Sequence, residues 1–376
     1  MNNVNKRYIF LFSSLIFFAG LVYFLFIPSF ETQKFDKDIV QEIADGVTTT
    51  TTTSLLNSTK NEQNEQIENT EIFENITEEE LSEIEQLLVN NTLNTKSGIE
   101  AYLLIGSDER NENSSASRGF VEGSRSDVIL LGIVNLENNQ NFLISIPRDT
   151  LIINSCTKKI ERINASFQNN DCGNKAENLA AAIYNLTGIE VVNFASFNFE
   201  GFEKIIDGFS GVEICVDKTQ REGYSFELQK GCQIVSGSTA LNWVVSRHTE
   251  VLVGEKIVDS NGEDISTWEP MPGVSDLTRV QRQQYVTTQL LKEVKNFQSI
   301  NELFKFIQAL EDTFVIDETL SLNKAVNLLW DLRNIDINSI KKLTLPTKPY
   351  VLDDGRQVLI LSKGFDEFAK ENSIGN

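Results

Sequence analysis

Four residues that can bind phosphate or a divalent cation flank two apolar segments, 128–134 and 142–146, in the middle of the chain. They form one arginine–aspartate pair before the first segment and another after the second: Arg125 and Asp127, then Arg148 and Asp149. Two apolar runs joined by an Asn-rich turn predict adjacent buried strands of a hairpin. Because the start of one strand lies beside the end of its antiparallel partner, we expect both pairs to meet at one end of a sheet.

That arrangement suits a phosphate group bound by arginine forks, together with a divalent cation held by carboxylate oxygens. Two ordinary Arg–Asp salt bridges at strand ends would explain the same four residues equally well. A third acid and arginine, Asp108 and Arg110, follow the apolar run 101–105 in the same way. The residues near the hairpin therefore leave both interpretations open.

The composition limits the classes of partner. The chain has 376 residues, of which 40% are hydrophobic, enough for one large domain or two ordinary ones. Its net charge of −21 argues against a nucleic-acid partner, which would require a basic face. Fifteen acidic residues and four lysines lie between positions 31 and 96, so about half of this charge is local. His248 is the only histidine, which excludes a site built from several histidines.

The N-terminal region predicts a membrane anchor. Residues 1–7 carry Lys6 and Arg7, and residues 8–27 contain no charge, a length of about 30 Å as a helix, which matches a bilayer core. Positive charges before this segment and acids after it predict a cytoplasmic N-terminus and an extracytoplasmic remainder. The alternative is a cleaved signal peptide, which the length of the segment and the absence of a small-residue cleavage site disfavour.

Residues 28–96 have the composition of a flexible tether, with a threonine run at 48–53 and many Asn, Gln and Glu residues. Within it, a capping box formed by Thr77 and Glu80 and apolar residues at helical spacing predict a short helix over 77–90. The folded domain is expected to span residues 97–376.

Within that domain, strands alternate with helices. The pattern predicts an α/β fold with a central mixed sheet between helices, mixed because the central pair of strands is a hairpin. Strands are expected at 191–197, 212–216, 340–345 and 358–361, and helices at 178–186, 199–209, 238–246, 276–297, 303–310 and 322–332. The polar segment 249–275 is expected to be a long loop.

The four cysteines lie in the presumed extracytoplasmic part, at spacings of 16 and 17 residues. Four cysteines allow three pairings. The local pairing, Cys156 with Cys172 and Cys215 with Cys232, closes two loops of similar size, each worth up to about 3 kcal/mol. A zinc site is disfavoured because the chain has no C-x-x-C motif, and buried free thiols remain an alternative.

Taken together, eight motifs in order resemble the LytR–CpsA–Psr (LCP) family of membrane-anchored cell-wall enzymes. The matching segments extend from about Gly98 to Val294: 104–110, 125–127, 145–150, 162–165, 198–202, 208–212, the helix from Gly237 to His248, and Asp276-x-x-Arg279-x-x-x-Gln283. The two cysteine pairs resemble those of actinobacterial members.

The resemblance implies a phosphotransferase. Such enzymes join a glycopolymer carried on a polyprenyl pyrophosphate lipid to a peptidoglycan sugar through a phosphodiester. It also implies the LCP fold, in which a hydrophobic tunnel holds the polyprenyl chain. Residues 179–186 and 286–291 are candidates to line such a tunnel, although ordinary core is the alternative for each of them.

Site residues follow from the matched motifs. Asp108 and Asp127 match the family's metal-binding and catalytic aspartates, with Mg²⁺ as the expected ion and Mn²⁺ as the alternative, and Asp108 is a candidate base. Arg125 and Arg148 are expected to join them in catalysis, and Asp149 and Asp276 to orient arginines. The pyrophosphate is expected to contact Arg110, Arg125, Arg148, Arg162, Arg247, Arg279 and Gln283.

One position departs from the family pattern. Val245 stands where members commonly carry the first arginine of Val-Arg-x-Arg-His, which removes one expected phosphate donor. Two further hypotheses stand beside the transferase. One is a lipid pyrophosphatase, which would act when no sugar acceptor is bound. The other, favoured by Val245, is a membrane-anchored regulator that binds lipid or cell wall without catalysis.

Overall fold

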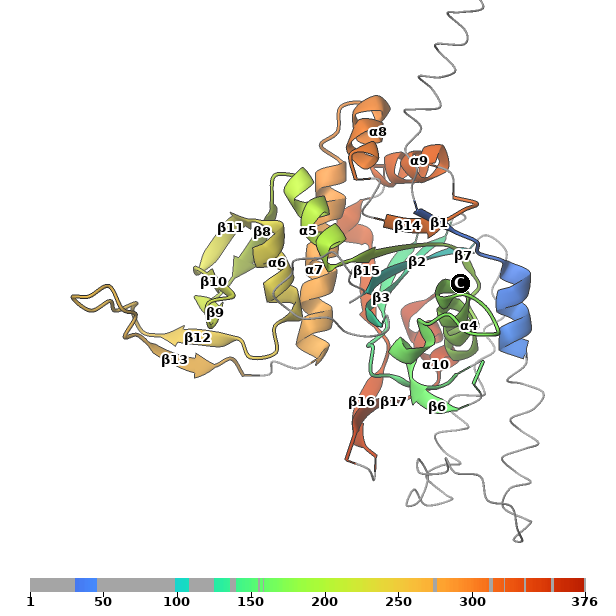
Figure 1. Cartoon of the computed structure of the whole chain (residues 1–376), viewed down its shortest axis with the longest axis horizontal. Helices are drawn as coiled ribbons and strands as arrows, with labels where there is room; N and C mark the ends of the chain where they lie inside the picture. Colours follow the sequence, from blue (N-terminus) through green and yellow to red (C-terminus); the bar gives the residue numbers. More distant parts are fainter. Residues whose placement is uncertain are drawn as a thin grey trace, which may run out of the picture.

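The computed structural model describes most of the chain from residue 31 onward (Figure 1). The described residues are 31–45, 99–107, 125–135, 140–154, 156–157, 159–272, 276–310, 314–320, 322–334, 336–352 and 355–374. The predicted anchor at 8–27 and the predicted helix at 77–90 lie outside them. None of the helices within the described ranges is long and apolar enough to cross a bilayer.

The predicted hairpin forms the centre of a seven-stranded mixed sheet. Strand β3 (Ser126–Asn135) pairs antiparallel with β4 (Asn141–Ser145), with Leu131 opposite Ile144. The sheet order is β1-β14-β7-β2-β3-β4-β15, and its other strands are β1 (Glu31–Gln33), β2 (Ile99–Ser107), β7 (Val191–Asn198), β14 (Phe314–Asp317) and β15 (Lys341–Thr344). Pairs β1–β14, β2–β7 and β4–β15 are parallel, which confirms a mixed sheet.

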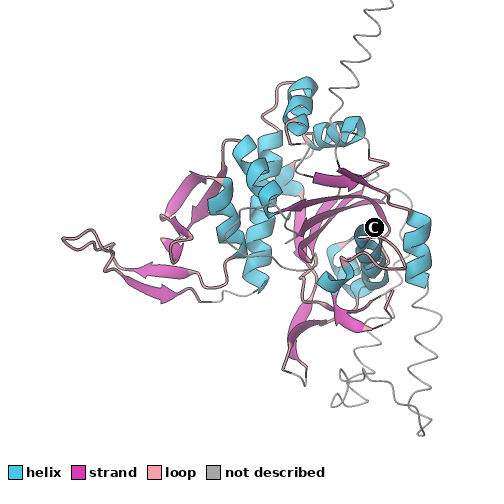
Figure 2. Cartoon of the chain, viewed as in Figure 1, coloured by secondary structure: helices cyan, strands magenta, loops and turns pink. Residues whose placement is uncertain are grey.

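Helices cover both faces of this sheet, as Figures 1 and 2 show. On one face lie α4 (Lys175–Thr187), α10 (Phe365–Asn372) and a helix at 37–45. On the other lie α5 (Phe199–Gly208), α6 (Gly237–Val245) and α7 (Asp276–Val294), extended by α8 (Ile300–Gln308) and α9 (Leu322–Leu332). The structure is therefore a three-layer α/β sandwich.

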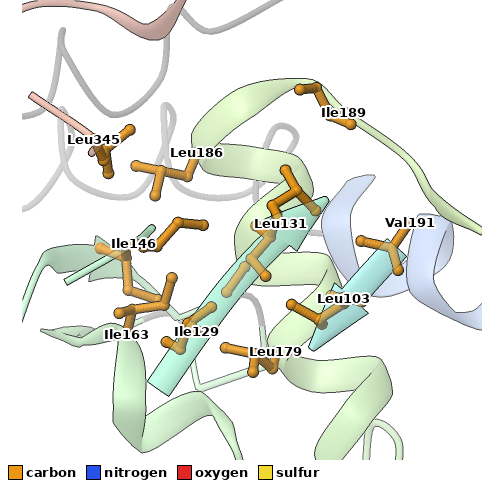
Figure 3. Packing of buried hydrophobic residues seen from close by; sticks show 14 of the residues in the cluster. Leu103, Ile129, Leu131, Ile146, Ile163, Leu179, Leu186, Ile189, Val191 and Leu345 are labelled. Carbon is orange, nitrogen blue, oxygen red and sulfur yellow. The ribbon is translucent and has the colours of Figure 1, made fainter. Parts of the chain in front are cut away.

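Alternation along the strands explains why α4 packs where it does. Leu103, Ile129 and Leu131 point to the same face of the sheet and are at most 2% exposed. They pack against Leu179 and Leu186 of α4 in the larger hydrophobic cluster (Figure 3). The side chains of 179–186 that we considered for a lipid tunnel thus belong largely to the ordinary core, since most of them are buried.

Residues 31–45 belong to the folded domain, so the predicted boundary at 97 is wrong for this segment. Strand β1 adds to the edge of the main sheet, and Phe35 packs on Phe194 with ring centroids 5.4 Å apart. Val40 and Ile43 are buried in the larger cluster. The buried carboxylate of Glu177 accepts hydrogen bonds from the backbone N–H groups of Asp36 and Asn174, at 2.9 and 3.0 Å.

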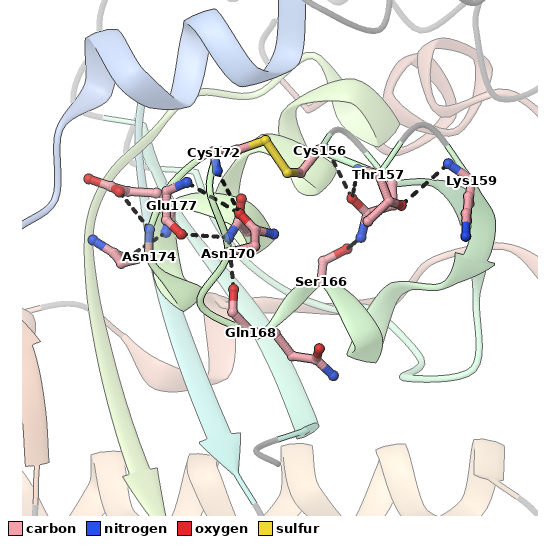
Figure 4. The surroundings of a disulfide bond; sticks show 12 residues. Cys156, Thr157, Lys159, Ser166, Gln168, Asn170, Cys172, Asn174 and Glu177 are labelled. Carbon is pink, nitrogen blue, oxygen red and sulfur yellow. Dashed lines mark hydrogen bonds between the residues drawn. A yellow bond between two sulfur atoms is a disulfide. The ribbon is translucent and has the colours of Figure 1, made fainter.

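Both local disulfides are present. Cys156 pairs with Cys172 beside the N-terminus of α4 (Figure 4), and Cys215 pairs with Cys232 across β8 (Val212–Val216) and β11 (Gly231–Val235). No cysteine is free. In the first loop, Asn170 Oδ1 accepts hydrogen bonds from the N–H groups of Cys172 and Gly173, at 3.0 and 3.3 Å. The loop therefore has its own hydrogen-bonded structure beside the capping box of α4.

The segment 249–275 is not simply a loop. It contains a hairpin of β12 (Glu250–Val253) and β13 (Thr267–Pro270), which projects from the body of the protein (Figure 1). These strands complete a four-stranded sheet with β9 (Gln220–Glu222) and β10 (Phe226–Leu228). Arg221 fixes their arrangement, because it pairs with Glu250 and Asp264 and stacks on Trp268 at 3.9 Å.

Glu177→Gln tests the attachment of residues 31–45. A neutral amide accepts the Asp36 N–H more weakly than a carboxylate, so we expect the free energy of unfolding to fall by about 1–2 kcal/mol. Glu190→Gln is the matched control, since Glu190 meets Lys37 at 3.6 Å but is 56% exposed. Its effect should stay within about 0.5 kcal/mol. Equal losses in urea denaturation of the two variants would contradict the proposed attachment.

Candidate active site

Two arginines and two aspartates meet at the end of the β3–β4 hairpin. Arg148 Nη1 donates to Asp127 Oδ1 in a short ion pair, and Arg148 Nε lies 3.4 Å from Asp149 Oδ2. Arg162 Nε lies 3.4 Å from the other oxygen of Asp149. The side chains of Arg148, Asp127 and Asp149 are 19%, 13% and 12% exposed, so the cluster is half-buried and still reachable from solvent. Asp127 thus meets the second predicted pair, Arg148 and Asp149, through Arg148, and the second arginine of the cluster is Arg162.

The backbone around Arg148 is held on several sides. The Thr150 N–H and hydroxyl both donate to the Pro147 carbonyl, at 3.0 and 2.7 Å. The Asn164 N–H donates to the Arg148 carbonyl at 3.2 Å, and Leu359 N–H donates to the Asp149 carbonyl at 2.9 Å. Hydrogen bonds within the turn and from two other chain segments therefore fix the position of Arg148 and Asp149.

Arg162 enters the cluster from a different pair of strands. It ends β6 (Ile160–Arg162), which pairs with β5 (Leu151–Ile153) and places Arg162 opposite Leu151. Its Nη2 donates to the Gln357 carbonyl of β17 (Gln357–Leu361) at 2.8 Å, and its side chain is 36% exposed. Asp149 thus orients both Arg148 and Arg162, as expected for a supporting residue.

Helix α7 carries Arg279 and Gln283, one turn apart and buried at 4% and 9% exposure. The helix is attached to the sheet by Gln284, whose Nε2 donates to Ser145 Oγ at 2.8 Å and to the Leu343 carbonyl at 2.7 Å. Ser145 ends β4, three residues before Arg148, so this contact places α7 beside the hairpin cluster. Gln284 is not predictable as a buried residue from the sequence, because a glutamine on a helix is ordinarily expected to face solvent.

Arg247 and Val245 lie near the C-terminus of α6. Arg247 is exposed, as is His248, whose Nδ1 lies 3.5 Å from Glu222 Oε1. Val245 packs against the second hydrophobic cluster, which α5, α6 and α7 share with the small sheets. A valine at this position therefore contributes apolar packing where the family pattern commonly has a guanidinium group.

The structure does not place every predicted site residue. Asp108 and Arg110 lie outside the described ranges, and the side chain of Asp276 is likewise not described, although the residue begins α7. Arg125 is exposed and immediately precedes β3. A register shift between Gly106 and Ser107 lies at the end of β2, where an added Cβ on Gly106 would be 2.9 Å from Val128 Cβ. This close approach explains the glycine two residues before Asp108.

Apolar side chains on the other face of the sheet are unusually accessible for interior strands. Leu104, Val128 and Phe197 are only half-buried, although β2, β3 and β7 lie inside the sheet order. Phe197 and Phe202 of α5 stack with centroids 6.2 Å apart, and Tyr285 and Leu290 of α7 are also partly buried. The face of the sheet toward α5 and α7 thus carries an accessible apolar surface formed by these partly exposed strand residues.

Comparison of the chain with known protein families identifies the family to which it belongs. The model of the LytR_cpsA_psr family matches residues 47–255 and 269–372. The chain belongs to the LytR_cpsA_psr family.

Characterised members of the family are distant relatives. The cell wall biosynthesis protein LcpA of Corynebacterium glutamicum is 26% identical over 67% of this chain and 51% of LcpA. A polyisoprenyl-teichoic acid–peptidoglycan teichoic acid transferase, TagU of Enterococcus faecalis, is 23% identical over 62% of this chain and 66% of TagU. The chain spans only about half the length of LcpA. Among solved structures, Bacillus subtilis TagV superimposes with a TM-score of 0.55 at 16% identity, covering 74% of this chain and 98% of TagV.

The family match has one internal gap. The match is interrupted between residues 255 and 269, which is the outer part of the β12–β13 hairpin. Its exposed large apolar residues include Ile257, Val258 and Ile265. Residues 256–268 of the projecting hairpin therefore lie outside the family match, whereas β12 and the arginine–aspartate cluster lie within it.

The carboxylate oxygens of the cluster are compatible with a bound magnesium ion. Asp127 uses Oδ1 for Arg148, and its Oδ2 has no hydrogen-bond partner among the described residues. Mg²⁺ is commonly held by one or two carboxylates together with phosphate oxygens of a substrate, so a larger acidic cluster is not required. The one group of potential ligands found in the described ranges, Glu213 with Cys215 and Cys232, has both its cysteines in a disulfide.

Gln284→Met tests whether α7 depends on its attachment to the sheet. Methionine keeps the length of the side chain but leaves the buried Ser145 hydroxyl and Leu343 carbonyl without this donor, so we expect a loss of about 1–3 kcal/mol in unfolding free energy. Gln281→Met is the matched control, because Gln281 is exposed on the same helix. Chemical denaturation of both variants measures the difference. Similar midpoints would contradict the role of Gln284.

Proposed function

We propose that this protein is a phosphotransferase that attaches a polyprenyl-pyrophosphate-linked glycopolymer to peptidoglycan. The observation that carries the proposal is the half-buried cluster of Arg148, Arg162, Asp127 and Asp149, with Arg279 and Gln283 on the adjoining helix. TagU, whose name states transfer of teichoic acid from a polyisoprenyl carrier to peptidoglycan, belongs to the relatives of the matched region.

In this proposal the arginines bind the pyrophosphate of the donor. Transfer of a phosphoryl group depends mainly on positioning and on neutralising negative charge, and forked guanidinium donors supply both. Asp149 keeps Arg148 and Arg162 in fixed orientations, which lowers the entropy lost when the phosphate binds. Arg125 and Arg247 are exposed and add positive charge at the rim. Arg110 is assigned to the same group from its sequence motif.

The accessible apolar surface on the face of the sheet toward α5 and α7 suits the polyprenyl chain. A prenyl chain gains about 25 cal/mol for each Å² of apolar surface removed from water, so side chains such as Leu104, Val128 and Phe202 would favour its binding. The polar head group would then lie at the arginine cluster.

The reaction forms one P–O bond and breaks another. A sugar hydroxyl of peptidoglycan attacks the phosphorus that carries the glycopolymer, and polyprenyl phosphate leaves. Asp108 is the proposed base that accepts the hydroxyl proton. Asp127, with Asp108, would hold Mg²⁺, or Mn²⁺ in its place, and the bound ion would supply further charge neutralisation for the phosphates.

The proposed location is the outer face of a cell membrane. Residues 8–27 are the proposed single-pass anchor, with a cytoplasmic N-terminus and the catalytic domain outside. Both disulfides agree with an oxidising compartment. Only residues 28–30 separate the proposed anchor from β1, so the domain would lie next to the bilayer that contains a lipid-linked donor.

One assay distinguishes the transferase from a pyrophosphatase and from a lipid-binding regulator, the function that Val245 in place of an expected arginine would favour. A fragment of residues 31–376, which retains the docked N-terminal segment, can be incubated with Mg²⁺, a polyprenyl-pyrophosphate-linked glycan and a peptidoglycan oligomer. Transfer to the oligomer supports the proposal. Release of free phosphorylated glycan alone would indicate a pyrophosphatase. Donor binding with neither product would indicate a lipid-binding regulator.

Asp127→Asn tests the catalytic assignment in the same assay. The amide keeps the shape of the side chain but removes the charge that faces Arg148 and the proposed cation, so we expect kcat to fall by about 100-fold or more. Asp366→Asn is the control, since Asp366 is a 46% exposed residue of α10 that pairs with Lys370 at 3.5 Å. Normal turnover by Asp127→Asn would remove the residue from the catalytic site.

A further inference from the structure

The second arginine of α7, Arg282, is buried and donates its hydrogen bonds to neutral groups. It is 5% exposed, its Nη1 donates to the Trp243 carbonyl at 2.9 Å, and its Nη2 donates to Thr249 Oγ1 at 3.0 Å. The guanidinium lies 5.1 Å from the centre of the Trp243 ring, and Nη2 lies 3.7 Å from Met271 Sδ. Within the described part of the chain, no carboxylate oxygen lies within 4 Å of its nitrogens.

A buried cation without an ion pair requires other stabilisation. Burial lowers the pKa of the Arg282 guanidinium to about 10; the charge of Glu222 opposes this shift, and the charge of Arg279 adds to it. The side chain remains charged at neutral pH. Its contact with the Trp243 carbonyl places the charge at the C-terminus of α6, where the helix dipole favours a cation.

The contacts of Arg282 join the two sides of one short turn. Trp243 lies in the last turn of α6, and Thr249 comes just before β12. Between them, the hydroxyls of Ser246 and Thr249 are hydrogen-bonded at 2.6 Å, and both residues are 1% exposed. Arg247 and His248 form the exposed part of this turn. Arg282 therefore fixes the two ends of the segment that presents Arg247.

The same contacts bring that turn to the phosphate-binding face of α7. Arg282 is three residues after Arg279, so the two side chains are neighbours on the surface of the helix. Gln283 is the next residue along the chain. Gln284 connects this part of α7 to Ser145 of the hairpin. A continuous chain of described hydrogen bonds thus runs from Ser145 through α7 to the turn at 246–249.

We infer that Arg282 is a positioning residue for Arg247, holding the 246–249 turn so that the Arg247 guanidinium faces the donor phosphates beside Arg279. This inference rests on the proposed function, because it assigns Arg247 to a pyrophosphate. Arg282 itself does not contact the substrate. Its guanidinium group donates hydrogen bonds to the Trp243 carbonyl and to the Thr249 hydroxyl instead.

The test is a double-mutant cycle on binding of a water-soluble short-chain polyprenyl pyrophosphate, measured by calorimetry on the 31–376 protein. Arg247→Ala removes one phosphate contact and is expected to raise Kd about tenfold. Arg282→Met should raise Kd by a similar factor. In the double variant the two effects should not multiply, because Arg282 acts through Arg247.

Two further variants keep the test informative if Arg282→Met folds poorly. Thr249→Val removes the acceptor for Arg282 with little change in shape, and it should weaken binding only when Arg247 is present. Arg282→Lys keeps the charge but loses the fork, so its Kd should lie between those of the wild type and Arg282→Met. Arg333→Met is the matched control, since Arg333 stacks on Trp330 at 3.8 Å and donates to the Lys295 carbonyl. It should lower thermal stability without changing Kd.

The outcomes separate the inference from the proposed function. If the wild type does not bind the pyrophosphate probe, the proposed function fails and the inference fails with it. If the wild type binds but the effects of Arg282→Met, Thr249→Val and Arg247→Ala multiply, the inference alone is overturned. Loss of thermal stability with unchanged Kd would also overturn it, because it would make Arg282 a purely structural residue.

Discussion

The ion pair between Arg148 and Asp127 depends on the register of the central hairpin. With Leu131 opposite Ile144, the first residues of β3 lie beside the residues that follow β4, and a shift by one residue would turn every side chain to the other face of the sheet. The same alternation puts Leu131 into the core that contains α4. Core packing therefore fixes the register, and the register fixes which charges meet.

The two faces of the sheet differ in how completely their apolar side chains are buried. The face toward α4 is closed, with side chains such as Leu103, Ile105 and Ile129 almost fully buried. The face toward α5 and α7 keeps Leu104 and Val128 half-buried. The closed face forms the core that holds the hairpin, while the partly exposed side chains of the other face are those to which we assign the polyprenyl chain in the proposed function. The second face is not exposed throughout, since Leu130, which lies opposite Leu104, is 1% exposed.

The sequence predicted much of the site because it depends on local pattern. Hairpin periodicity was enough to bring Asp127 to Arg148, and the spacing of the cysteines favoured the pairing that is present. Arg282 and Gln284 could not be found in this way, because polar residues on a helix are expected to face solvent unless their buried partners are known. Those partners, Trp243, Thr249, Ser145 and Leu343, are distant in sequence. The β12–β13 hairpin was likewise missed, because its two short strands are separated by a polar, Gly-containing connection and β13 ends at a proline.

The N-terminal segment shows why composition alone misplaced the domain boundary. Residues 31–45 have few large apolar side chains, but Phe35, Val40 and Ile43 are spaced so that all three reach the core. Their attachment also needs the buried carboxylate of Glu177, which lies about 140 positions away and accepts the Asp36 N–H. Because Glu177 is also part of the capping box of α4, the end of that helix and the N-terminal segment share one anchor point. The segment next to the proposed membrane anchor is thus connected through α4 to the same core that fixes the register of the central hairpin.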